Sequence, residues 1–181
     1  MLRLIISGVF LLFFLNAYAG EPAELFSKME GTWTATGVRR SAVHEGSQAR
    51  VEIRAETDAT LDADGTRLVS RNRLSEVEFD SSGNATTHRD YDRVYWVMPD
   101  AASGRYLLGG YKDGAAQPAA STGLWSEDGV FKVTQPLGGG YRIESETRFS
   151  SDSETIYHEV FYQDARRLAD TVLTYRRTVK K

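Results

Sequence analysis

Gly31-Thr32-Trp33 is the stretch that decides the fold of this 181-residue chain, and it follows a short segment from Pro22 to Met29. The apolar residues of that segment are spaced to face one side of a helix or a 3₁₀ turn: Leu25, Phe26 and Met29. We expect this short helix to cover one end of a sheet, and the tryptophan that follows it to plug the same end.

Alternating side chains dominate the rest of the chain. Residues 50–57 alternate charged with apolar or small side chains, and residues 141–149 repeat the pattern with arginine and glutamate at every second position. This period of two is typical of strands that are wet on one face and buried on the other. Turn sequences such as Asp62-Ala63-Asp64-Gly65 separate the strands. The connections are too short for parallel crossovers, so the strands are predicted to be antiparallel.

We therefore predict an all-β protein: a single up-and-down antiparallel β-barrel of about nine or ten strands with a short N-terminal helix, since closure removes the exposed sheet edges. The predicted strands are residues 32–40, 50–57, 66–79, 85–97, 105–111, 122–126, 130–135, 141–149, 154–162 and 168–179. Gly109-Gly110 inside one strand is expected to mark a bulge or a tight bend. A two-sheet sandwich is the alternative, but it needs long returns, and residues 114–120 are the one candidate.

Residues 1–19 have the three-part layout of a secretory signal peptide. A basic start at Arg3 precedes an apolar run from Leu4 to Leu15, and Ala17-Tyr18-Ala19 forms an A-x-A cleavage sequence. The apolar run is about 12 residues long, whereas a membrane-spanning helix needs roughly 20. We predict cleavage after Ala19, export to the periplasm or the extracellular space, and one domain over residues 20–181.

The amino-acid composition of the mature chain excludes some classes of binding partner and some structural features. The whole chain has a formal charge of −3, and removing Arg3 with the signal peptide takes it to −4. This mildly acidic balance argues against nucleic acid, which requires a basic face. The chain has no cysteine, so disulfides are excluded although the predicted compartment permits them. No later run is apolar enough to predict a transmembrane segment.

The beginning and the end of the predicted barrel resemble the lipocalins of the calycin group. In that group a Gly-x-Trp begins the first strand, and a basic residue of the last strand packs over the tryptophan. The resemblance therefore implies that Arg176 or Arg177, in the closing Tyr175-Arg176-Arg177, is the cation–π partner of Trp33, a contact worth roughly 0.5–2 kcal/mol. Residues 100–106 and 123–129 are also similar to small bacterial lipocalin-like domains of unknown function.

No catalytic residue is predicted. The chain has no serine in a Gly-x-Ser-x-Gly elbow. Gly138-Gly139-Gly140 is not followed by a predicted helix and so makes no phosphate cradle. His88, Asp90 and Asp92 share one face of a strand and have the atoms of a metal site. Such charged runs are routine on the wet face of a sheet, and we assign no metal ligand.

Tyr91, Arg93 and Tyr95 share one face of the strand that ends at Val97. A barrel of about ten strands leaves interior space that side chains do not fill. If this face points inward, an arginine beside tyrosines favours an anionic head on an apolar ligand. We therefore predict Arg93, Tyr91 and Tyr95 as ligand-binding residues of a small apolar or amphipathic molecule, with no cofactor.

His158 is the fourth predicted ligand-binding residue. It lies in mid-strand with Ile156 and Val160 as same-face neighbours, and these apolar neighbours predict that it points inward. An inward histidine is either a satisfied interior residue or a haem ligand, as in the similar nitrobindin-type barrels.

The sequence thus predicts an exported, non-catalytic protein that holds a small apolar or amphipathic molecule inside a β-barrel. The alternative is a haem-binding or enzymatic barrel that uses an interior histidine. A third hypothesis is a scaffold protein whose outer face binds a partner.

Overall fold

A computed structural model of the chain describes residues 22–43, 47–126 and 128–178. The predicted signal peptide, residues 1–19, lies outside the described residues. Among the residues described, no helix is long and apolar enough to span a bilayer.

One helix precedes the strands. Helix α1 spans Pro22–Met29. The strands are β1 (Gly31–Val43), β2 (Ser47–Leu61), β3 (Leu68–Phe79), β4 (Ala85–Asp100), β5 (Arg105–Lys112), β6 (Ala115–Ala116), β7 (Ser121–Ser126), β8 (Val130–Gly138), β9 (Tyr141–Phe149), β10 (Glu154–Gln163) and β11 (Arg166–Arg177).

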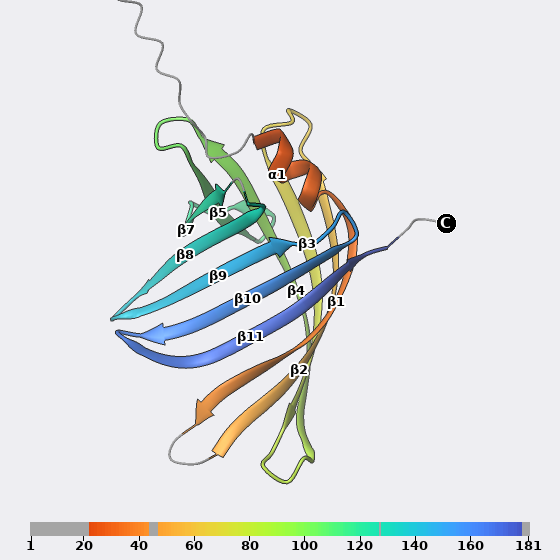
Figure 1. Ribbon diagram of the computed structural model, residues 1–181, viewed down its shortest axis with the longest axis vertical. Coiled ribbons are helices and arrows are strands. Elements are labelled where there is room, and N and C mark those ends of the chain that lie inside the picture. The colour runs from red at the N-terminus through yellow and green to blue at the C-terminus, as the bar shows by residue number, and fades with distance from the viewer. Residues whose placement is uncertain (1–21, 44–46, 127, 179–181) are drawn as a thin grey trace, which may run out of the picture.

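The strands close into one antiparallel barrel. Their order in the 11-stranded sheet is β4-β3-β2-β1-β11-β10-β9-β8-β7-β5-β6, and an additional β4–β5 pairing completes the ring. The two-residue strand β6 pairs with β5 alone and stands outside the ring of ten. Figure 1 shows the strands wrapped around a single interior with α1 at one end. The prediction of one up-and-down barrel with a short N-terminal helix is confirmed, and a two-sheet sandwich is excluded.

The alternation in β2 places its side chains as the sequence predicts. Val51, Ile53 and Ala55 are buried, whereas Arg54 and Glu56 are exposed. The buried residues join Ala35 of β1 and Leu173 of β11 in one hydrophobic cluster on the barrel wall. A second cluster lies at the end covered by α1 and contains Leu25, Phe26, Ala59, Leu68, Val97, Tyr106, Trp125 and Phe131.

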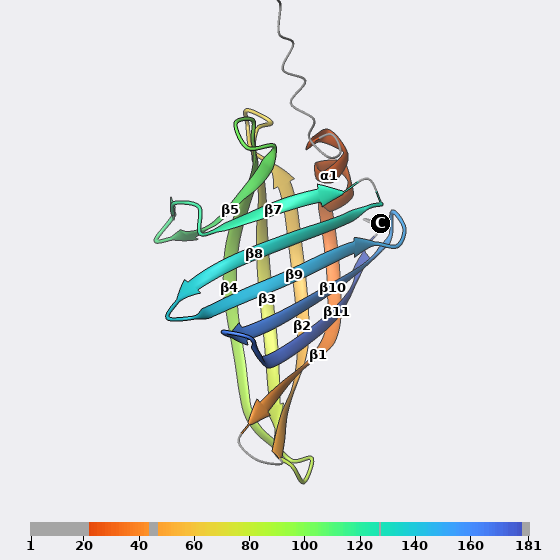
Figure 2. The same ribbon diagram turned by 60° about the vertical axis from the view of Figure 1, so that its left-hand side comes forward.

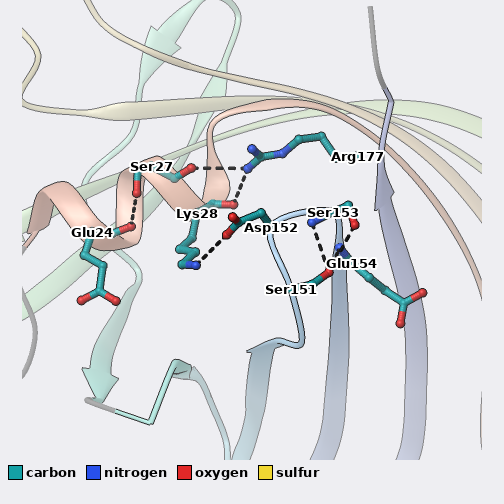
Figure 3. A network of polar contacts seen from close by, with 8 residues as sticks. All are labelled: Glu24, Ser27, Lys28, Ser151, Asp152, Ser153, Glu154 and Arg177. Atoms are coloured by element: carbon teal, nitrogen blue, oxygen red, sulfur yellow. Dashed lines mark hydrogen bonds and ion pairs between the residues drawn. The ribbon is translucent and has the colours of Figure 1, made fainter.

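Trp33 and Arg177 join the helix to the barrel. Trp33 is 4 % exposed, and its indole Nε1 donates a hydrogen bond of 2.9 Å to the carbonyl of Met29. The guanidinium of Arg177 lies over the indole, 4.5 Å from the ring centroid. It also donates hydrogen bonds to the carbonyls of Ser27 (3.3 Å) and Lys28 (3.0 Å), as Figure 3 shows. The last carbonyls of α1, which have no partner within the helix, are therefore satisfied by the barrel.

An ion pair adds a second link between the helix and the barrel. The Nζ atom of Lys28 lies 2.8 Å from a carboxylate oxygen of Asp152 in the turn between β9 and β10 (Figure 3). Arg176, the other predicted partner of Trp33, points to the outside and pairs with Glu154 at 3.3 Å. Of the two predicted partners, Arg177 therefore makes the cation–π contact with Trp33, because successive residues of a strand point to opposite faces.

Gly109 and Gly110 in β5 do not form the bulge that was one of the two expectations for them. The pairing of β5 with β4 runs through both glycines without a register shift, so neither marks a bulge. A Cβ atom at Gly109 would lie 2.5 Å from the indole ring of Trp96, whereas at Gly110 the nearest atom is 3.6 Å away. Gly109 is therefore needed for the close approach of a buried tryptophan ring.

We expect Gly109→Ala to destabilise the fold by about 1–3 kcal/mol, because the added methyl forces the Trp96 ring from its place. Gly110→Ala is the matched control and is expected to stay within about 0.5 kcal/mol of the parent protein. Urea unfolding followed by tryptophan fluorescence measures both. Equal losses of stability would show that the packing at Trp96 is not the cause.

Candidate ligand-binding cavity

The barrel encloses a cavity of about 390 Å³. Inward-facing residues from both halves of the strand ring line it, and Met29 and Trp33 contribute from the helix end. Its apolar wall includes Ile53, Leu74, Val97, Leu108, Phe131, Val133, Ile143 and Leu173. A volume of this size is typical of small-molecule sites.

The barrel wall has a gap beside β4, through which the interior meets solvent. Within the described residues, β4 pairs with β5 only over Tyr95–Asp100, although it pairs with β3 from Ala85 to Val97. Figure 2 shows the β1–β2 and β3–β4 hairpins extending past the ends of β8–β11 on the side away from α1. Tyr95, at the start of the β4–β5 pairing, lines the cavity and is nevertheless 41 % exposed.

A charged network occupies the cavity wall formed by β1, β3 and β4. Arg39 donates two hydrogen bonds, of 3.2 and 3.0 Å, to the two carboxylate oxygens of Glu76. The hydroxyl of Tyr91 donates a further hydrogen bond of 2.5 Å to Glu76. Glu76 is 7 % exposed, and these bonds offset the cost of burying its charge.

The same contacts shift the acidity of both partners. Burial alone would raise the pKa of Glu76, but hydrogen bonds from Tyr91 and Arg39 outweigh it and hold the pKa below its ordinary value of 4.5. Burial raises the pKa of Tyr91 to about 12, and the hydrogen bond to Glu76 and its charge add to the effect. Tyr91 is therefore a neutral hydrogen-bond donor at physiological pH.

Arg93 lies beside this network. Its guanidinium stacks over the ring of Tyr91, 4.8 Å from the centroid, and donates a hydrogen bond of 3.1 Å to the hydroxyl of Tyr95. No ion pair joins Arg93 to a carboxylate of the described chain, although the charge of Glu76 acts on it from a distance. The structure places Tyr91, Arg93 and Tyr95 on the cavity wall, and their role in binding a ligand stays a prediction.

A second polar group lines the wall formed by β9, β10 and β11. The hydroxyl of Tyr157 donates a hydrogen bond of 2.6 Å to Glu159. Burial, and then the charge of Glu159, raises the pKa of Tyr157 well above its ordinary value. The pKa of Tyr175 rises to about 12, first through burial and then through the charge of Glu159. Thr155 also lines the cavity and is 4 % exposed, and its Oγ1 finds no hydrogen-bond partner within the described part of the chain.

His158 does not line the cavity, and its predicted inward orientation is wrong. Its neighbours Thr155, Tyr157 and Glu159 form the inner face of β10, which sends His158 outward. The side chain of His158 is 45 % exposed and contacts Asp170 at 2.6 Å. The hypothesis of haem ligation through an interior histidine loses the residue that suggested it.

His88 lies on the outer face of β4, which the sequence predicts to be polar. Its side chain is 61 % exposed and lies 3.2 Å from a carboxylate oxygen of Asp90. Across the ranges that the structure describes, no group of three or more histidines and acidic residues is arranged to hold a metal ion.

Sequence reasoning missed several polar residues of the cavity wall: Arg39, Glu76, Thr155, Tyr157, Glu159 and Tyr175. Strand parity would have found two of them. Arg39 lies six residues after Trp33 on the same face of β1, and Glu76 lies two residues after the inward Leu74 of β3.

Comparison with solved structures supports this architecture. The S-type phycobiliprotein lyase CPES from Guillardia theta superposes with a TM-score of 0.59 at 14 % identity, covering 91 % of this chain and 96 % of that one. A protein of unknown function from the DUF3598 family of Nostoc punctiforme gives a TM-score of 0.52 at 12 % identity, covering 84 % of this chain. This chain spans about half of that second protein, 49 %.

Identities at this level show the fold alone. No family model matches the chain, and no curated protein matches it either. The fold and its cavity define the class as a closed antiparallel β-barrel with an interior cavity. Membership of a particular lipocalin-like family stays a prediction.

We expect Glu76→Gln to lower the free energy of unfolding by up to about 3 kcal/mol at neutral pH, because Arg39 loses its ionic partner in a partly buried site. The lowered pKa of Glu76 means that its ionised form stabilises the fold above pH 4.5, and that this contribution is lost as the pH falls below 4.5. The difference between the parent protein and the variant should therefore shrink in acid.

Urea unfolding at about pH 7 and about pH 3.5 measures this difference. Glu52→Gln is the control, since Glu52 forms an exposed pair with Arg50 on the outer face; it should cost less than about 1 kcal/mol. A Glu76→Gln deficit that is the same at both pH values would contradict the role of the carboxylate charge.

Proposed function

We propose that this chain is an exported, non-catalytic binding protein that holds a small amphipathic molecule with an anionic head inside its barrel. The observation that carries the proposal is Arg93, a cation at the edge of the cavity that no carboxylate of the described chain pairs with. Arg39, the other arginine of the wall, is already occupied by Glu76. Among the described residues that line the cavity, Arg93 is therefore the arginine that remains for a ligand.

The surroundings of Arg93 suit an anionic head. Stacking on Tyr91 holds the guanidinium plane in place, and the hydroxyl of Tyr95 accepts one of its five N–H donors. The remaining donors can meet a carboxylate or a phosphate in a two-pronged arrangement. Beyond this point the wall becomes apolar at Leu74 and Ile143, where a hydrocarbon portion of the ligand is removed from water.

Two further points support the proposal from outside the site. The barrel is shared with the phycobiliprotein lyase, so the architecture is one that recurs in solved proteins. Export rests on the sequence of residues 1–19, and the lack of catalysis rests on the absence of a predicted nucleophile or catalytic pair.

We expect Arg93→Gln to weaken the binding of dodecanoate about tenfold, because a hydrogen-bonded charge pair is worth roughly 1.5–3 kcal/mol and part of that is lost to solvent at this exposed position. Displacement of the fluorescent probe 8-anilinonaphthalene-1-sulfonate by dodecanoate measures the affinity.

Arg54→Gln is the matched control, since it removes the same charge from the exposed outer face of β2. It should leave the affinity within about twofold of the parent protein. Equal weakening in both variants would mean that overall charge, not the cavity, attracts the anion. No displacement by dodecanoate in the parent protein would overturn the proposed function.

We also expect cleavage after Ala19 when the full chain is expressed in a bacterial host with an intact secretion pathway. The intact mass of the periplasmic or extracellular product should correspond to residues 20–181. Retention of residues 1–19 on a cytoplasmic product would contradict the export part of the proposal.

A further inference from the structure

Glu159 is a second charge of the cavity wall that has no counter-ion among the described residues. It lines the cavity from β10, and in the described part of the chain its side chain accepts one hydrogen bond, from the hydroxyl of Tyr157. No arginine or lysine of the described chain forms an ion pair with it, whereas Glu76 in the same cavity is paired with Arg39. Interior charges are normally paired, so an unpaired carboxylate on a cavity wall points to a group that arrives with the ligand.

The strand order places β10, which carries Glu159, across the barrel from β4, which carries Arg93. From β4 to β10 the ring passes β3, β2, β1 and β11 on one side, and β5, β7, β8 and β9 on the other. Five steps in either direction separate the two strands, so β4 and β10 are opposite walls of the same barrel. Arg93 and Glu159 both line the cavity between these walls.

Tyr175 of β11 connects the two sides. It lies near enough to Glu159 and to Tyr95 for both to raise its pKa. Tyr95 is in turn the hydrogen-bond partner of Arg93. Arg93 and Glu159 thus border the same cavity, and Tyr95 and Tyr175 line it with them.

We propose that the ligand of this cavity is amphoteric: it carries a cationic or N–H donor group that binds Glu159 as well as the anionic group that binds Arg93. This inference rests on the proposed function, which supplies the anionic group. A purely anionic ligand would be repelled by Glu159, whose hydrogen bond from Tyr157 supplies no positive charge. A donor group on the ligand removes that cost and adds a charge-assisted hydrogen bond.

Three compounds of equal chain length test the inference: dodecanoate, dodecylamine and 12-aminododecanoate. Their flexible chains let the ends adjust to the separation between Arg93 and Glu159. Displacement of 8-anilinonaphthalene-1-sulfonate at about pH 7 is expected to rank 12-aminododecanoate about tenfold tighter than either compound with a single charged group.

Glu159→Gln should remove the preference for 12-aminododecanoate. The variant should bind dodecanoate either within about twofold of the parent protein's affinity or more tightly than the parent protein. Glu144→Gln is the matched control, because Glu144 pairs with Arg142 on the neighbouring strand β9 and does not line the cavity. The control should keep the preference of the parent protein.

The outcomes separate the two proposals. If dodecanoate binds through Arg93 but 12-aminododecanoate binds no tighter than dodecanoate, the amphoteric ligand is wrong and the proposed function stands. A preference that survives in Glu159→Gln would likewise overturn the role of Glu159. If dodecanoate does not bind the parent protein at all, the proposed function itself fails. The comparison of compounds on the parent protein needs no variant, so it decides the matter even if Glu159→Gln does not fold.

Discussion

The contact on which the rest of the structure depends is that of Trp33 with Arg177 and the end of helix α1. One residue from the first strand and one from the last meet here, and both also bind carbonyls of the helix. The same contact therefore joins β1 to β11, whose pairing closes the barrel, and holds helix α1 against the barrel end. Because the last carbonyls of the helix have no partners within it, these hydrogen bonds make the docking of the helix and the closure of the barrel stabilise each other.

The charged side chains that line the cavity differ in whether they have a partner of opposite charge. Arg39 and Glu76 neutralise each other and form part of the wall. Arg93 and Glu159 do not have such partners in the described chain. Burial and nearby carboxylate charge raise the pKa values of Tyr91 and Tyr175 to about 12, so these two residues of the cavity wall add no charge to it.

Strands β4 and β10 show where alternation of side chains along a strand predicts the inward face and where it does not. In β4 the assignment of Tyr91, Arg93 and Tyr95 to the inner face agrees with the lining of the cavity. In β10 the same reasoning placed His158 inside because its neighbours are apolar. The rule that apolar residues point inward fails there, since this wall of the cavity is polar and Ile156 is 38 % exposed on the outside.

The sequence by itself determined the direction of the strands, their approximate number and the helix before them, because period-two alternation, turn residues and short connections are local signals. The pairing of a late arginine with Trp33 was implied by the resemblance to the lipocalins. Only the tertiary structure decided which of the two faces of β10 is inside, where the barrel wall lacks a partner strand, and that Glu159 and Arg93 line one cavity from opposite walls. Those facts depend on strand register and ring closure, which bring together residues far apart in the chain and leave no mark on any one segment.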